Sequence, residues 1–103
     1  MVVVQCNNED QIHRDNDEPA IIRNDGTLEY YQYGNKYRKY DRPSVINIFD
    51  DNFKIYTNNK GEKHRDVGTS EIQNNGTQLK FYTNGELRNE VNLSKEDFRK
   101  IGV

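Results

Sequence analysis

The sequence predicts a mainly β fold: a single antiparallel meander sheet of about three tandem β-hairpin repeats, followed by a short C-terminal capping helix. The first observation is an internal repetition: His13–Asn35, HRDNDEPAIIRNDGTLEYYQYGN, recurs in degenerate form at His64–Glu86 as HRDVGTSEIQNNGTQLKFYTNGE. The second is that Asn-Asp-Gly or Asn-Asn-Gly separates two apolar segments in these copies, which is typical of a β-hairpin. The third is a period-two alternation in the second apolar segment, which indicates a strand with one buried face.

Composition favours one domain with a thin core. The chain has 103 residues, of which 32% are hydrophobic and 31% charged, and its mean hydropathy is −1.15. A chain of this length suits one domain, and so few apolar residues suit one sheet that is buried mainly on one face. We divide the chain into a leading strand with an acidic segment (1–12), three hairpin repeats (13–37, 38–63 and 64–88) and a capping helix (93–102).

The N-terminal segment predicts a leading strand, because Val2–Val4 is a run of β-branched residues. It is too short for a secretory signal, and no apolar run approaches the ~20 residues of a membrane span. Cys6 is the only cysteine, which rules out an internal disulfide and favours a reducing compartment. We therefore expect a cytoplasmic protein, in the host cytoplasm if a virus or phage encodes it.

Four arginines mark the repeat units. Arg14, Arg38, Arg65 and Arg88 lie 24, 27 and 23 residues apart, and the second copy reads YRKYDRPSVINIFDDNFKIYTNNKGEK. Aligning the copies puts Tyr31, Tyr56 and Tyr82 in register, on the face that also receives Glu29, Lys54 and Lys80. The opposite face is then the predicted core: Ile22, Leu28, Tyr30, Ile46, Ile48, Phe53, Ile55, Ile72, Leu79 and Phe81. A shift of one residue in any strand would exchange its two faces.

The C-terminal segment LSKEDFRKIG has the signals of a short helix over 95–101. Ser94 is a good N-cap, Glu96 and Asp97 favour the first turn, and Gly102 favours a stop. We expect this helix to cover the open end of the sheet, because an uncovered sheet edge promotes aggregation.

The repeated motifs resemble the MORN-variant repeats of small bacterial antitoxin-like proteins. They are more similar still to the tandem HR-x-x-x-PA…DGT…YY-x-x-G units found in proteins of phages, giant viruses and low-GC bacteria. The similarity spans about Gln11 to Arg88 and is carried by HRDNDEPAII with DGTLEYYQYG, RKYDRPSVI, and HRDVG with NGTQLKFYTNG. The second copy departs from it with Tyr37 in place of His, and the third lacks the Pro. The resemblance implies a non-enzymatic binding module, in several cases one that neutralises a protein partner.

Enzymatic and metal chemistry are not expected. The protein-kinase His-Arg-Asp loop needs an Asn five residues beyond the Asp, where this chain has Ala20 and Glu71. Ser44, Ser70 and Ser94 lie in no nucleophile-elbow motif. His13, His64 and Cys6 lack metal-ligand spacing, so we expect no catalytic residue, cofactor or metal.

The tyrosines of the polar face are the candidate binding surface. Tyrosine is enriched at protein interfaces because it offers a large rigid ring with one polar end. Cross-strand stacking that steadies the sheet is the commoner explanation of such a pattern, and it is compatible with a binding role. We expect a small inhibitor that sterically neutralises a protein partner: an antitoxin or immunity protein against a toxin, or a phage-encoded antidefence protein such as an anti-CRISPR that covers a host nuclease. The expected partner contacts are Tyr31, Tyr33, Tyr56, Tyr82, Glu29, Lys54 and Lys80.

Two alternatives from other classes stay open. One is a nucleic-acid-binding protein, because the segment Lys36–Arg42 interleaves cations with aromatic rings: Lys36, Arg38, Lys39, Tyr40 and Arg42. The acidic sequence pI of 5.7 makes a large electrostatic footprint unfavourable. The other is a structural repeat protein that self-associates through an open sheet edge, with Val2–Val4 as the candidate strand. The sequence leaves the oligomeric state open.

Overall fold

The computed structural model describes residues 2–93 and is mainly β, with one large antiparallel sheet, as the sequence predicts. Eight strands form this sheet in the order β1-β2-β3-β6-β7-β8-β9-β10, and β4 and β5 form a separate two-stranded hairpin. The strands are β1 Val3–Val4, β2 Ile21–Ile22, β3 Thr27–Glu29, β4 Tyr31–Gln32, β5 Asn35–Lys36, β6 Val45–Asn47, β7 Asp50–Ile55, β8 Glu71–Gln73, β9 Gln78–Thr83 and β10 Glu86–Asn92.

No α-helix occurs among residues 2–93, and the one helical turn there is the 3-10 segment η1, Asn74–Gly76. The helix predicted over 95–101 lies outside the described residues. The leading strand predicted at Val2–Val4 is confirmed as β1, which pairs antiparallel with β2.

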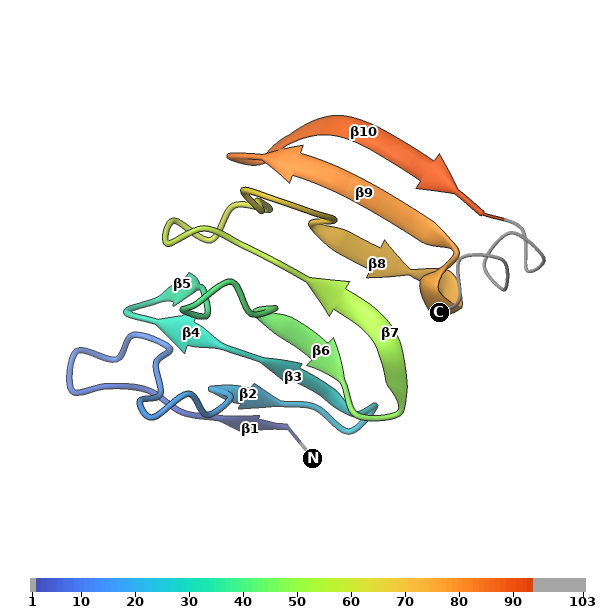
Figure 1. Ribbon diagram of the computed structural model, residues 1–103. Coiled ribbons are helices and arrows are strands. Elements are labelled where there is room, and N and C mark those ends of the chain that lie inside the picture. Colours follow the sequence, from blue (N-terminus) through green and yellow to red (C-terminus); the bar gives the residue numbers. More distant parts are fainter. Residues whose placement is uncertain (1, 94–103) are drawn as a thin grey trace.

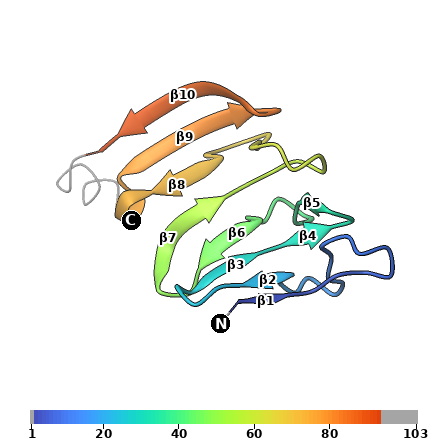
Figure 2. The ribbon, with the colours of Figure 1, turned by 180° about the vertical axis from the view of Figure 1, so that it is seen from behind.

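The sheet is a single curved layer whose outer edges are β1 and β10 (Figures 1 and 2). The long connections before β2, β6 and β8 lie at one end of the strands, here called the loop end. The short connections that follow β2, β6 and β8 lie at the other end, called the turn end (Figure 1). Because nothing else of the described chain covers the layer, side chains of the sheet must bury one another.

Cross-strand pairing defines two rows of side chains, one on each face. Residues directly opposite one another on paired strands point to the same side. The row on the apolar face is Val3, Ile22, Leu28, Ile46, Lys54, Ile72, Leu79 and Val91. The row on the opposite face, called the carboxylate face, is Val4, Ile21, Glu29, Val45, Ile55, Glu71, Lys80 and Glu90.

The predicted core is wrong for the second repeat. Phe53 and Ile55 lie on the carboxylate face, because Lys54 is the residue that pairs with Ile46 and Ile72. Ile48, also assigned to the core, is 58% exposed at the turn end.

The cause is the length of the hairpin connection. Five residues separate the paired residues Ile22 and Leu28, whereas seven separate Ile46 and Lys54 across a β-bulge. An alignment by residue type therefore slips by one in this strand and exchanges its faces.

Of the two paired rows, the one on the carboxylate face is the more deeply buried, since Ile21, Glu29, Val45 and Glu71 are all buried. Further buried residues lie next to members of this row in the chain and therefore point to the opposite face, near the loop end: Ala20, Tyr30, Ser44, Tyr56 and Ser70. Every residue of the apolar-face row is only half-buried. The row on the carboxylate face is better covered because long cationic and aromatic side chains fold back over it.

Candidate functional site

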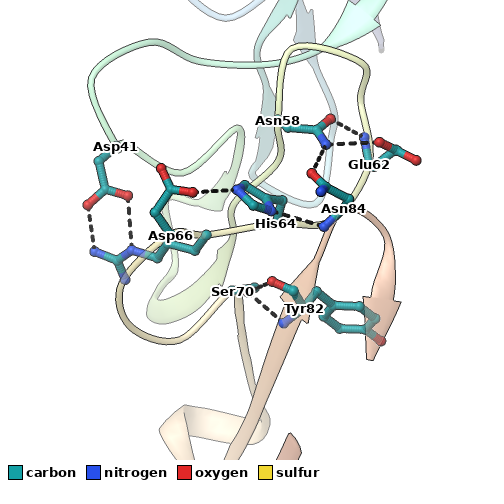
Figure 3. Close-up of polar contacts among 9 residues, drawn as sticks. Asp41, Asn58, Glu62, His64, Asp66, Ser70, Tyr82 and Asn84 are labelled. Atoms are coloured by element: carbon teal, nitrogen blue, oxygen red, sulfur yellow. Dashed lines mark hydrogen bonds and ion pairs between the residues drawn. The ribbon is translucent and has the colours of Figure 1, made fainter. Parts of the chain in front are cut away.

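Two corner loops, Asn7–Gln11 and Asn58–Glu62, have matching hydrogen bonds at the loop end. In each, the asparagine Oδ1 accepts from the backbone amides two and four residues later, at 2.9 and 3.1 Å in the first loop and 3.0 and 3.1 Å in the second. The asparagine side-chain amide donates to Gln11 Oε1 or Glu62 Oε1 (Figure 3). Such side-chain turns hold the corner without help from the sheet.

The two histidines fasten these corners to a hairpin further along the chain. His13 Nδ1 accepts the backbone amide of Tyr33 at 3.0 Å, and His64 Nδ1 accepts that of Asn84 at 2.9 Å (Figure 3). An accepting Nδ1 requires the proton on Nε2, which then donates to an aspartate two residues away, at 2.8 Å in both copies. Both ring nitrogens of each histidine are therefore used to hold the fold.

Two arginines stack on the rings of the preceding repeat. The Arg38 guanidinium lies 4.0 Å from the centre of the Tyr30 ring, and that of Arg65 lies 3.8 Å from Tyr56. Both rings are buried. Stacking of a planar cation on an aromatic face is favourable electrostatically and also excludes water from the ring.

The same arginines are held by aspartates of the preceding loop. Asp17 accepts two hydrogen bonds from Arg38, at 2.8 and 3.1 Å, and also pairs with Arg42. Asp41 accepts two from Arg65, at 3.1 and 3.3 Å (Figure 3). The hydrogen bond from Arg38 lowers the pKa of Asp17 below its usual value.

Three connected hollows run along the loop end, and together they form what we call the loop groove. The middle hollow, of about 270 Å³, shares Arg14 and Asp15 with one neighbour and Tyr37, Arg38 and Arg42 with the other. The outer hollows measure about 450 and 470 Å³. The groove thus crosses from the first corner loop to the second.

Exposed apolar side chains stand along this groove. Tyr33 is 63% exposed, Tyr40 81% and Val67 82%, and each lines one of the three hollows. Tyrosine and arginine are the residue types that most often dominate the binding energy of protein interfaces. This combination can bind a protein surface without any reactive group.

The carboxylate face holds two buried glutamates under cationic side chains. Glu29, 5% exposed, pairs with Arg23 and with Lys36 Nζ at 3.0 Å. Burial raises the pKa of the Glu29 carboxyl, but the hydrogen bonds from Arg23 and Lys36 outweigh it and leave the pKa below its usual value.

Glu71, 1% exposed, lies 2.7 Å from Lys63 Nζ and 3.7 Å from Lys80 Nζ. These ion pairs, rather than hydrogen bonds of regular geometry, compensate its burial. This close contact with the Glu71 carboxylate in turn raises the pKa of Lys63.

The seven predicted partner contacts do not form one surface. Glu29, Lys80, Tyr31 and Tyr82 lie on the carboxylate face, where Lys36 covers the Tyr31 ring at 5.9 Å and Lys63 the Tyr82 ring at 5.1 Å. Lys54 lies on the apolar face, and Tyr33 lies at the loop end.

Tyr56 is not equivalent to Tyr31 and Tyr82. It is 8% exposed and carries Arg65 as Tyr30 carries Arg38, so its structural counterpart is Tyr30. The register in the second repeat, set by the longer hairpin connection, is again the reason.

The predicted nucleic-acid segment Lys36–Arg42 is divided between two surfaces. Lys36 pairs with Glu29 on the carboxylate face, and Arg38 and Arg42 pair with Asp17 in the loop groove. Lys39 and Tyr40 are exposed beside the groove, with the Arg42 guanidinium 5.3 Å from the Tyr40 ring. Three of the four cations of this segment therefore already have a carboxylate partner.

Among residues 2–93, no group of three or more His, Cys, Asp or Glu side chains is placed to hold a metal ion. No helix within that part of the chain is long and apolar enough to cross a membrane. Comparison of the chain with protein-family models, curated proteins and solved structures found no significant match.

Sequence reasoning missed most of the loop groove, including Arg14, Tyr37 and Val67. The sequence does contain a signal for the two corner loops at the ends of the groove. Cys6–Asp15, CNNEDQIHRD, and Thr57–Asp66, TNNKGEKHRD, share Asn-Asn and His-Arg-Asp at a spacing of 51 residues. That match extends the repetition to the side-chain turns that form both corner loops.

Proposed function

We propose that this chain is a non-enzymatic protein-binding module that inhibits a protein partner by covering its working surface. Its most concrete form is an antitoxin or immunity protein, or a phage-encoded antidefence protein such as an anti-CRISPR. In this proposal the three tandem hairpin repeats expected from the sequence, capped by a C-terminal helix, are the scaffold. The resemblance of the repeat motifs to antitoxin-like proteins supports the class of protein.

The loop groove is the observation that supports the binding site. It is a continuous concave surface with exposed Tyr33, Tyr40 and Val67 along it, and half-buried arginines beneath that stack on buried rings. The Asp17–Arg38 and Asp41–Arg65 pairs hold the loops in place before binding. A preformed surface loses less conformational entropy on association than a flexible one.

The charge arrangement favours a protein over a nucleic acid. Binding of nucleic acid draws its affinity from cations that are free to neutralise phosphates. In the groove, Arg14, Arg38 and Arg65 pair with Glu18, Asp17 and Asp41 respectively. A mixed and internally neutralised surface with exposed aromatic rings is typical of protein recognition.

The test is affinity capture of partners by the tagged protein, from cells of its source or of that source's host, with and without nuclease treatment. Tyr40→Ala and Tyr33→Ala are the groove variants, and Phe49→Ala is the matched control. Phe49 is a suitable control because it is an aromatic residue as exposed as the groove tyrosines, at 78%, and lies at the turn end, away from the groove. Thermal unfolding of each variant verifies that the fold is kept.

One stoichiometric protein, captured despite nuclease, lost with the groove variants and kept with Phe49→Ala, is the expected result. Loss of capture with Phe49→Ala but not with the groove variants would move the binding site away from the groove. A partner that disappears with nuclease and with Lys39→Ala would make the nucleic-acid function the better one. Failure to inhibit the captured protein's activity would reject the inhibitor function.

A further inference from the structure

Each of the two outer strands of the sheet corresponds to one strand of an internal hairpin whose other strand is missing. In each internal hairpin a first strand (β2, β6 or β8) pairs with a second strand (β3, β7 or β9). Among residues 2–93, β1 pairs only with β2 and β10 only with β9 in the large sheet. β1 therefore occupies the position of a second strand, because it lies beside β2 as β7 lies beside β8. β10 occupies the position of a first strand, because it lies beside β9 as β8 lies beside β7.

The residue pairs across each strand boundary show which residues of β1 and β10 correspond to which residues of the inner strands. Glu90 and Val91 pair with Lys80 and Leu79 across β9–β10, as Glu71 and Ile72 pair with Ile55 and Lys54 across β7–β8. At the other edge, Val4 and Val3 pair with Ile21 and Ile22, as Ile55 and Lys54 pair with Glu71 and Ile72. Within the described part of the chain, each outer strand therefore lacks the kind of neighbour that the other outer strand could supply.

We propose that the chain associates head to tail, with β10 of one copy pairing antiparallel with β1 of the next in the register of the internal hairpins. At this edge the next copy takes the place of the helix over 95–101 that is expected to cap a single copy. Val91 would then lie opposite Val3 of the next copy, as Ile22 lies opposite Leu28 in the first hairpin. The contact joins two different edges, so β1 of the first copy and β10 of the last copy stay unpaired at the ends of the assembly. Further copies can therefore add at either end.

The side chains at the two edges fit this contact. On the apolar face, Leu79, Val91 and then Val3 and Ile22 of the next copy would form one unbroken apolar strip. Val2 and Val4 are each 50% exposed at the free side of β1, and pairing would bury them. The surface buried is small, so the association is weak and depends on concentration.

Backbone geometry at β1 leaves the required groups free. Gln5 donates its amide to the Ala20 carbonyl at 2.8 Å, and antiparallel strands alternate their bonding direction residue by residue. The polar groups of Val4 therefore point to the open side. In the β6–β7 hairpin the equivalent carbonyl, that of Ile55, accepts the Ser44 amide at 2.8 Å.

Cys6 offers a direct probe of this register. Its counterpart is Thr57, since Cys6 and Thr57 form the equivalent bridges to Ile12 and Lys63. Thr57 Oγ1 lies 2.8 Å from Ser44 Oγ, and the counterpart of Ser44 in β10 is Asn89, which pairs with Phe81. The proposed contact therefore brings Cys6 of one copy beside residue 89 of another.

The experiment introduces Asn89→Cys, oxidises the protein mildly with oxidised glutathione, and maps the disulfides by mass spectrometry. The expected result is a ladder of multimers whose linked peptides join position 6 to position 89. Glu90→Cys is the matched control, because the adjacent side chain points to the carboxylate face. It should cross-link at least about tenfold less, since disulfides form only when the two Cβ atoms approach closely.

Val4→Pro tests the contact without a new cysteine. Proline removes an amide that points to the open side and is tolerated in edge strands, so the fold should survive while the multimer fraction falls about tenfold. In sedimentation velocity, the average mass of the unmodified protein should rise with concentration beyond that of a dimer. A constant monomer mass, disulfides joining 6 to 6 or 89 to 89, or equal cross-linking by Glu90→Cys would each overturn the proposal.

Discussion

At the scale of single residues, arginine rather than lysine holds one hairpin on the next. Arg65 stacks on Tyr56 at 3.8 Å, donates two hydrogen bonds to Asp41 and a third to the Thr69 carbonyl at 3.1 Å. Only a planar guanidinium can stack on a ring and donate in several directions of its plane. The residue is thus chosen for its geometry as well as for its charge.

We expect Arg65→Lys to lower the free energy of unfolding by about 1–2 kcal/mol, because the lysine loses the stack and the paired hydrogen bonds. Urea denaturation at neutral pH measures the change. Arg88→Lys is the matched control: that arginine is 57% exposed and pairs only with exposed Glu86 among the described residues, so its effect should stay within about 0.5 kcal/mol. Equal effects of the two changes would contradict a stacking role.

At the scale of elements, the connections at the turn end decide how each hairpin is built. Gly26, in the connection after β2, has φ +89° and is buried against the exposed ring of Phe49 from the next hairpin. A Cβ at this position would lie 2.5 Å from a Phe49 ring carbon. The turn of one hairpin therefore packs against that of the next, which couples neighbouring repeats at this end.

We expect Gly26→Ala to destabilise the protein more than Gly34→Ala. Both glycines have a positive φ near +85 to +89°, so alanine costs each about 1 kcal/mol of backbone strain. At Gly34 the added Cβ would meet Gln11 Cβ at an ordinary contact distance of 3.8 Å. Gly26→Ala instead forces the exposed Phe49 ring to move, at an added cost of about 1 kcal/mol, the low end of overpacking costs. Chemical denaturation of the single variants and of Gly26→Ala with Phe49→Ala tests this. If removing the ring restores no stability, the clash is not the cause.

At the scale of the whole molecule, a single layer with few apolar residues depends on paired charges. Asp17 in the loop groove and Glu29 on the carboxylate face are both held ionised by cationic neighbours, which lowers the pKa of each carboxyl. Asp17 joins the segment 13–37 to Arg38 of the next one, whereas Glu29 pairs with Lys36 inside the same segment. Protonation of Asp17 would weaken a contact between segments, and protonation of Glu29 a contact within one.

The pH dependence of stability follows from the sign of these shifts. A carboxyl whose pKa is lower in the folded state stabilises that state above its unfolded pKa of about 4, and this stabilisation is lost as the pH falls through the folded pKa. We expect the urea midpoint to fall steadily below about pH 4. Asp17→Asn should lower the midpoint at pH 7 and flatten its further decline, and a midpoint unchanged down to pH 3 would contradict the assignment.

Local patterns were enough to predict the class of fold. Period-two alternation and Asn-Gly turns depend on neighbours within a few residues, so they identify strands and tight turns directly. The prediction of a mainly β chain with one large antiparallel sheet rests on them and is confirmed. The leading strand, predicted from the β-branched run Val2–Val4, is confirmed as well.

The sequence by itself determined that this chain forms strands, that residues 24–26 form a turn, and which arginines recur. In the second hairpin the turn lies at Ile48 and Phe49, and the expected turn residues 50–52 begin β7 instead. Only the tertiary structure decided the register of the second repeat, the burial of Glu29 and Glu71 under lysines, and the assembly of the loop groove from three separate loops. The physical reason is the range of the interactions. Turn and strand propensities act over a few residues. The faces of a strand, by contrast, are exchanged by a one-residue shift in its pairing with the next strand, and a groove exists only after distant loops have been brought side by side.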